Sequence, residues 1–222
     1  MLSRWDVWPC THACTAMFSI PLAEVAHVVP PPLVAKKDKH GRAEIEVGYV
    51  RFRTGIHNLP ATEELAWAIA VERRKGMGFA FYAMNIAADN TPFLDWNEAI
   101  GFNVHRKPTR FRADLDRQSY EVVDTDGPVC VLRHQPEGSL RLPLLPMNTE
   151  VWTRRDDGGL ARRVFKWRGM VNVHLASSVA SSLYPHPFFN GVRVDRAEPL
   201  PTTILASRRL DSCAAQLFTA PA

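Results

Sequence analysis

The stretch Asp95-Trp-Asn-Glu98-Ala-Ile-Gly101-Phe102-Asn103-Val104-His105-Arg106-Lys107-Pro108 carries most of the information on how this chain folds. We expect a short strand after the glycine. Side chains alternate between the two faces of a strand, so Val104 and Arg106 would share one face and His105 and Lys107 the other. A histidine can transfer protons near neutral pH, and an arginine can hold a carboxylate with two hydrogen bonds, so His105 and Arg106 are candidate site residues.

The same stretch resembles the catalytic strand of the acetoacetate decarboxylase-like family. In that family a segment reading roughly Gly-Arg-Glu-x-x-Gly-Phe-Pro-Lys-Lys carries the lysine that forms a Schiff base with a keto acid. Glu98, Gly101 and Phe102 fit this frame, and Val104 stands where the Schiff-base lysine would be. The resemblance implies that the nucleophile is replaced in this chain.

Lys107 is the one lysine near that position. A two-residue insertion after Phe102 would place Arg106 and Lys107 on the lysine pair of the family, with Arg106 in place of the nucleophile. An active amine must be neutral, which requires burial or a neighbouring cation, and a solvated lysine before Pro108 is the alternative. The other five lysines are expected in a polar loop, a turn and a hairpin strand: Lys36, Lys37, Lys39, Lys75 and Lys166. A true decarboxylase with a lysine supplied from elsewhere in the fold stays open.

The resemblance extends over the first half of the chain, in the family's order and at similar spacing. Residues 18–33 look like its early helix and Val-Pro-x-x-Leu exit, and residues 64–71 and 78–90 look like the two strands before the lysine segment. Glu64 falls where the family keeps an active-site glutamate, whereas Thr11 or a neighbour stands where a substrate-binding arginine would be expected. Beyond about residue 143 only a pattern of hairpins and a late Pro199-Leu-Pro match.

The fold class implied is mainly β with short helices (α+β), as an antiparallel cone-shaped β barrel around an apolar pocket. Glu64 would lie near the floor of the pocket, where burial would raise its pKa and suit it to general acid or base catalysis; the alternative is a solvated strand start. The residues expected to line the pocket and contact substrate are Phe81, Met84, Trp96, Phe102 and Val104.

Local patterns predict mostly strands. Short helices are expected over 21–29, where Ser19 could cap, and over 91–98, where Thr91 could cap and Pro92 suits the first turn. The alanines of 64–71 would also permit a helix, but the resemblance favours a strand. Strands are predicted over 43–53 (with one wet face), 64–71, 79–86, 109–115, 119–123, 129–133, 192–195 and 202–208, and a hairpin over 150–155 and 160–167 around Asp156-Asp-Gly-Gly159.

Composition is ordinary for a globular protein. At 222 residues, 46% hydrophobic, the chain is expected to form a single domain over 1–222. Its 27 basic and 23 acidic residues are scattered, which argues against nucleic-acid binding. No secretory signal or membrane-spanning run is recognisable, so a cytoplasmic location is expected. Cys10-Thr-His12-Ala-Cys14 lacks the usual zinc spacing, and ordinary thiols are favoured. Neither a metal nor an organic cofactor is indicated.

These observations lead to two functional hypotheses. The first is a lyase-type or isomerase-type enzyme acting on a small keto-acid-like or polyketide-like metabolite, without the Schiff-base lysine, with Glu64 and His105 in proton transfer. The second is a non-catalytic small-ligand-binding module on the same barrel. Exposed strand edges favour a homo-oligomer, and the resemblance implies the same because members of that family form oligomers.

Overall fold

The computed structural model describes residues 6–53, 59–73, 78–114, 116–117, 119–133, 140–155, 157–175, 180–200 and 202–217. The expected turn around Lys75 and the position of Asp156 lie outside these residues. Within them, no helix is long and apolar enough to cross a membrane.

A large sheet contains most of the described strands. Its order is β12-β1-β13-β10-β9-β4-β3-β2, and β1 also pairs with β2, at the other end of that order. The pairs β4–β5 and β4–β9 are parallel and the others are antiparallel. The strands are β1 (Asp6–Ile20), β2 (Ala43–Phe52), β3 (Thr62–Ala70), β4 (Phe79–Ala88), β5 (Val104–His105), β9 (Leu140–Arg154), β10 (Leu160–Leu175), β12 (Glu198–Pro199) and β13 (Thr202–Leu217).

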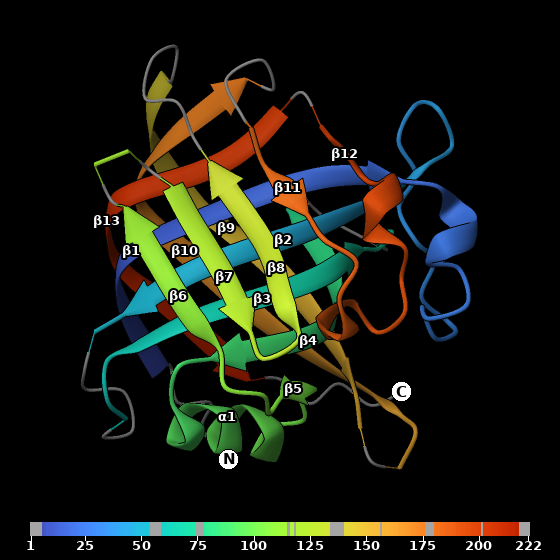
Figure 1. Ribbon diagram of the computed structural model, residues 1–222, viewed down its shortest axis with the longest axis horizontal. Helices are drawn as coiled ribbons and strands as arrows, with labels where there is room; N and C mark the ends of the chain where they lie inside the picture. The colour runs from blue at the N-terminus through green and yellow to red at the C-terminus, as the bar shows by residue number, and fades with distance from the viewer. Residues whose placement is uncertain are drawn as a thin grey trace.

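A small antiparallel sheet lies in front of the large one in Figure 1. Its order is β11-β8-β7-β6, with β6 (Arg110–Asp114), β7 (Ser119–Asp124), β8 (Gly127–Arg133) and β11 (Ser182–Leu183). The helical elements among the described residues are α1 (Thr91–Ala99) and the 3-10 turns η1 (Leu22–Glu24), η3 (Pro187–Phe189) and η4 (Val194–Arg196). The described part of the chain is therefore mainly β with one regular helix.

The two sheets enclose an apolar layer, which we call the interlayer core. On β3 the side chains of Leu65, Trp67 and Ile69 enter it, and Tyr120 and Val122 of β7 meet them from the small sheet. The indole Nε1 of Trp67 donates to the carbonyl of Phe188 at 2.9 Å. Burying these large side chains supplies a hydrophobic driving force for the two layers to pack.

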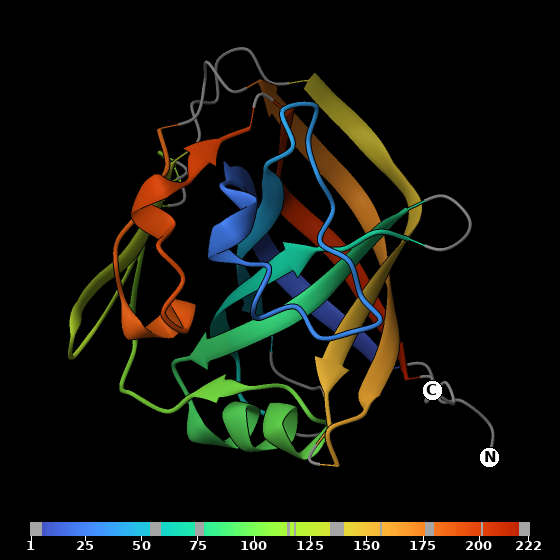
Figure 2. The same ribbon diagram turned by 90° about the vertical axis from the view of Figure 1, so that its right-hand side faces the viewer.

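The opposite face of β2, β3 and β4 is turned away from the small sheet, and we call it the inner face. One apolar cluster there joins Val50 and Phe52 of β2 to Val151 of β9 and Phe165 of β10, although β2 and β9 are not neighbours in the sheet. The large sheet must curve to bring them together. Figure 2 shows this curvature, with α1 below it.

Helix α1 covers one end of the inner face. The side chain of Asn90 caps it by accepting from the amide of Phe93 at 2.9 Å, and Pro92 lies in its first turn. Thr91, the expected cap, is instead its first residue. Phe93 and Leu94 pack into the inner-face cluster, so the helix positions the Gly101 turn that follows it.

Two predicted elements are wrong. Residues 21–29 form only the 3-10 turn η1, followed by further turns, because no side chain caps its start. Residues 192–195 enter the turn η4 rather than a strand, because Asn190 and Gly191 adopt positive φ and redirect the chain. Val192 and Val194 are both buried in the interlayer core, so their alternation does not indicate a strand.

Candidate active site

Glu64 lies on the inner face of the large sheet. It is paired with Val50 of β2 and Ala88 of β4, and both of these belong to the inner-face cluster. Directly paired residues point to the same side of a sheet. Its neighbour Glu63 takes the other side and accepts a 2.5 Å hydrogen bond from the hydroxyl of Tyr49. The two consecutive glutamates therefore have different environments.

The Glu64 carboxyl is deep in the protein but still partly accessible. Burial raises its pKa to about 8. Its apolar neighbours disfavour the charged form, and no hydrogen bond or cation among the described residues offsets that cost. A carboxyl of this kind can exist in both protonation states near neutral pH, which a general acid or base requires.

Glu46 is a second inner-face carboxyl that the sequence analysis did not single out. It is paired with Ala68. Along the strand this pair is two residues from the Gly48–Ala66 pair and four residues from the Val50–Glu64 pair. At about 3.3 Å per residue its backbone lies roughly 13 Å along the sheet from Glu64. Burial raises the pKa of Glu46 to about 7. The face of residues 43–53 that was expected to be wet is thus the inner face, where Glu44 and Glu46 are followed by Gly48 and by the buried Val50, so the expected exposure is wrong.

Small side chains separate these two carboxyls. Gly48 and Ala66 form a directly paired couple between them. A Cβ added to Gly48 would lie 3.4 Å from the Thr15 hydroxyl and 3.8 Å from a Glu46 carboxylate oxygen. Ala66 and Ala68 are partly accessible, whereas Leu65, Trp67 and Ile69 on the other face are fully buried. The inner face is therefore the more open side of β3.

Three of the five expected lining residues join the inner-face cluster, on the same face as Glu64. Phe102 is a buried member, and Trp96 and Val104 pack against it. Val104 is paired with Ile86, on the inner side of β4. Phe81 lies in a separate small cluster with Met17 and Ala70. Met84 enters the interlayer core, on the opposite face from Glu64.

None of the lysines whose side chains the structure describes is buried. Lys36, Lys37 and Lys39 are exposed in the loop before β2. The ammonium group of Lys107 pairs with the Asp126 carboxylate, and 45% of its side chain is exposed. Lys75 and the side chain of Lys166 lie outside the described residues. Val104, which the sequence resemblance sets at the Schiff-base lysine position, is apolar and faces the inner cluster.

His105 and Arg106 are directed away from Glu64. Arg106 is exposed and pairs with Asp95 and Glu98 of α1. His105 is paired with Ala87, a member of the interlayer core, so its ring lies on the small-sheet side. There its Nε2 is 2.5 Å from a carboxylate oxygen of Asp124, and its ring meets that of Phe188 edge-on. The structure therefore does not bring His105 together with Glu64.

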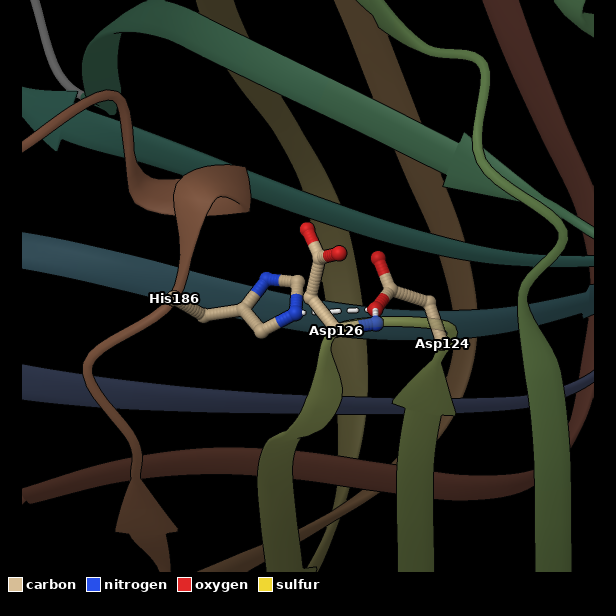
Figure 3. A group of neighbouring side chains, drawn as sticks. All are labelled: Asp124, Asp126 and His186. Carbon is tan, nitrogen blue, oxygen red and sulfur yellow. Dashed lines mark hydrogen bonds and ion pairs between the residues drawn. The ribbon is translucent and has the colours of Figure 1, made fainter.

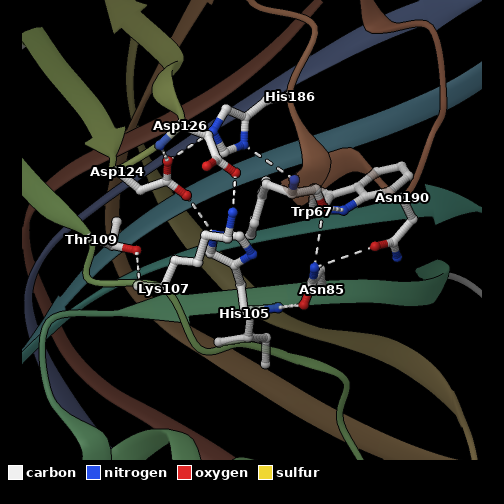
Figure 4. Close-up of polar contacts among 11 residues, drawn as sticks. Trp67, Asn85, His105, Lys107, Thr109, Asp124, Asp126, His186 and Asn190 are labelled. Atoms are coloured by element: carbon white, nitrogen blue, oxygen red, sulfur yellow. Dashed lines mark hydrogen bonds and ion pairs between the residues drawn. The ribbon is translucent and has the colours of Figure 1, made fainter.

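Asp124 is the centre of this polar network, shown in Figure 4. Its side chain has no exposed surface and contacts His105 through one oxygen and His186 through the other, at 2.9 Å. The amide of Asp126 donates to it as well, at 2.6 Å. The hydrogen bond with His105, the Asp126 amide and His186 lower the Asp124 pKa against the opposing effect of burial. A buried, ionised carboxylate joins β5, β7 and η3.

Figure 3 shows Asp124, Asp126 and His186, whose possible ligand atoms lie within 4.8 Å of one another. His186 Nδ1 accepts from the Phe188 amide at 3.1 Å, so its proton is on Nε2 and is donated to Asp124. A metal ion would need the lone pair of that Nε2. Asp126 is already paired with Lys107. These contacts fit a hydrogen-bond network better than a metal site.

Comparisons with known proteins rest on structure alone. No model of a known protein family matches the sequence, and no curated protein has a significant match to it. Solved structures do match. The acetoacetate decarboxylase from Legionella pneumophila has a TM-score of 0.64 at 9% identity, over 98% of this chain and 88% of its own. An acetoacetate decarboxylase-like enzyme from Sphingomonas wittichii RW1 has a TM-score of 0.62 at 11% identity, over 100% of this chain and 94% of its own.

This chain has the acetoacetate decarboxylase-like fold. The resemblance drawn from residues 95–108 is confirmed at that level. A third neighbour is the enduracididine biosynthesis enzyme MppR, solved in complex with pyruvate, with a TM-score of 0.58 at 8% identity over 98% of this chain and 89% of its own. Such identities show a shared fold and leave chemistry to be argued from the residues. In this chain, the inner face of that fold carries carboxyls and small apolar side chains.

Proposed function

We propose that the large sheet forms the cone-shaped barrel expected from the resemblance and binds a small keto-acid-like or polyketide-like metabolite on its inner face. The reaction is of lyase or isomerase type, with Glu64 transferring the proton. The observation that carries the proposal is the inner-face position of Glu64, with a pKa raised to about 8. MppR, solved with pyruvate, supports a keto acid as the ligand class.

The chemistry does not require an amine. A β-keto acid that loses CO2 leaves an enolate, and a protonated Glu64 can return a proton to its carbon. In an isomerisation, ionised Glu64 removes a proton next to the carbonyl and delivers it to a different atom of the same substrate. Either step uses a carboxyl that holds and releases one proton near neutral pH. Glu46 offers a second such group on the same face.

The test is turnover of a panel of keto acids by the wild type, Glu64→Gln and Lys107→Ala. Glu64→Gln is expected to lower kcat by about a hundredfold or more, in the range typical of a general acid or base. Lys107→Ala is expected to retain wild-type activity, since its ammonium is paired with Asp126 outside the inner face. Loss of activity in Lys107→Ala with retention in Glu64→Gln would contradict the proposal.

Borohydride trapping addresses every lysine, including Lys75 and Lys166. The protein is reduced in the presence of each keto acid, and its peptides are mapped by mass. We expect no lysine adduct. An adduct would establish the Schiff-base alternative, with the lysine supplied from elsewhere in the fold. Tight binding of a panel member without turnover would favour the binding-module hypothesis.

A further inference from the structure

Arg163 of β10 is a buried cation on the inner side of the large sheet. Its residue is 8% exposed, and it is paired with Val151, which packs into the inner-face cluster. One terminal nitrogen, Nη1, donates to the hydroxyl of Thr153 at 2.6 Å. The guanidinium carbon lies 4.9 Å from the centre of the Phe102 ring. The group is thus held in place by one hydrogen bond and one cation–π contact.

These contacts leave the guanidinium with unused donors and, among the described residues, no counter-ion. Its Nε is buried without a hydrogen-bond partner, and no carboxylate of the described residues forms an ion pair with it. Burial lowers its pKa to about 10, so the group stays positively charged at neutral pH. Arginine prefers to bind a planar carboxylate through two parallel hydrogen bonds, which this group does not have.

Space in front of this cation is provided by Gly101, the glycine of the turn after α1. A Cβ built there would lie 3.6 Å from Arg163 Nη2 and 3.8 Å from the Thr153 hydroxyl oxygen. The glycine is partly accessible and has φ +85°, a conformation that other residues seldom adopt. The donors of Arg163 and Thr153 therefore face a position that holds no side chain.

The space between Gly101 and the Arg163 guanidinium lies on the same face of the sheet as the proposed acid–base groups. Thr153 follows Trp152, which is paired with Tyr82, so it lies level with Ala83 of β4. Ala83 is paired with Ala68, and Ala68 with Glu46. Two alanines thus separate the cation from a carboxyl that is largely uncharged below neutral pH. Near neutral pH, that row therefore presents a bound anion at Arg163 with only the partial negative charge of Glu46.

We propose that Arg163, with Thr153, binds the carboxylate of the substrate on the inner face. It would do the work of the substrate-binding arginine that is missing around Thr11, from β10 instead of the N-terminal strand. This inference rests on the proposed function and narrows it: the ligand is an anionic keto acid, recognised at its carboxylate end, and a neutral analogue binds poorly.

The test is a titration of the protein with pyruvate, pyruvamide and acetoacetate, followed by the ¹⁵N signal of Arg163 Nε and by calorimetry. Arg163→Lys identifies the signal. We expect pyruvate and acetoacetate to move it and pyruvamide and chloride to leave it in place. Arg163→Met is expected to weaken pyruvate binding by at least about tenfold, the range for hydrogen bonds to a charged group.

Arg162 provides the matched control. It is the adjacent arginine, faces the other way and is paired with Glu150 at 2.5 Å. Arg162→Met should keep wild-type pyruvate affinity and lower the Tm, because it breaks an ion pair. Arg163→Met should keep or raise the Tm, because it removes an uncompensated buried charge. A purely structural Arg163 predicts the opposite: a lower Tm and unchanged affinity.

The outcomes separate this inference from the proposed function. An Arg163 signal that none of the carboxylates moves, or equal pyruvate affinity in Arg163→Met and wild type, overturns the inference even if keto acids are turned over. Carboxylate binding through Arg163 with no turnover of any keto acid supports the inference and contradicts the proposed enzyme.

Discussion

Buried carboxyls on the two sides of the large sheet differ in their hydrogen bonding and in the direction of their pKa shifts. On the interlayer side the buried Asp124 carboxylate contacts two histidines and accepts from one amide, and its pKa is lowered. On the inner side, Glu64 and Glu46 form no hydrogen bond or ion pair with other described side chains, and their pKa values are raised by burial. Groups whose hydrogen bonds are satisfied hold the layers together. Groups left unsatisfied cost stability and remain available for a substrate.

The largest effect is expected from removing the paired carboxylate. Asp124→Ala leaves His105 and His186 without their shared acceptor in a buried position, and we expect it to lower the free energy of unfolding by about 3–5 kcal/mol. Chemical denaturation measures this change. Asp95→Ala, which removes an exposed partner of Arg106, is the control and should change stability little. A small loss in Asp124→Ala would show that the interlayer network is not a structural element.

A smaller effect, of opposite sign, is expected on the inner face. The pKa of Glu64 is higher in the folded than in the unfolded chain, so the folded state binds more protons and stability falls as pH rises from about 4.5 to 8. Glu64→Gln removes this penalty. It should equal the wild type near pH 4 and be more stable at pH 9 by about 3 kcal/mol, which is less than the roughly 5 kcal/mol of the full shift because Glu64 is partly accessible to water. Denaturation at both pH values measures the difference, and a destabilised Gln variant at pH 9 would contradict the account.

The interlayer network has the reverse pH dependence. Because the Asp124 pKa is lowered in the folded state, its contribution is present above the unfolded value of about 3.8 and is lost as pH falls through the folded value. Wild-type stability should therefore decline on both sides of mildly acidic pH. The alkaline decline should shrink in Glu64→Gln, whereas the acid decline should not.

The sequence predicts those parts of the fold whose signals lie within a few neighbouring residues. The strand pattern of 43–53, the short helix after Asn90 and the glycine turn at Gly101 follow from alternation, capping and turn chemistry, so they are recognisable. The long β1 is not predicted, because its strand state depends on pairing with β2 and β13. Pairing between distant strands has no local signal.

The residues of the candidate site also differ in whether local sequence or long-range contacts place them. Glu64 and Val104 are predicted from their places in strands that resemble the family's, and both lie on the inner side. His105 is predicted as a proton carrier from its chemistry alone, but its direction is set by pairing with Ala87 and by Asp124, nineteen residues further along the chain. Arg163 could not be found because scattered arginines look alike until one is seen buried without a carboxylate.

The smallest effect is expected from Lys107→Ala. An ion pair that is nearly half exposed contributes less than about 1 kcal/mol, so the free energy of unfolding should barely change. Denaturation compares the variant with the wild type. A loss of stability as large as that of Asp124→Ala would place Lys107 in the buried network and would contradict the proposed difference between the two faces.

The most direct test of the central claim is a ¹³C NMR titration of the glutamate carboxyls, with Glu64→Gln and Glu46→Gln to assign the two inner-face signals. The account predicts a midpoint of about 8 for Glu64 and about 7 for Glu46. Midpoints near 4.5 for both, the ordinary value for an exposed glutamate, would show that the inner face is wet and would contradict proton transfer by Glu64.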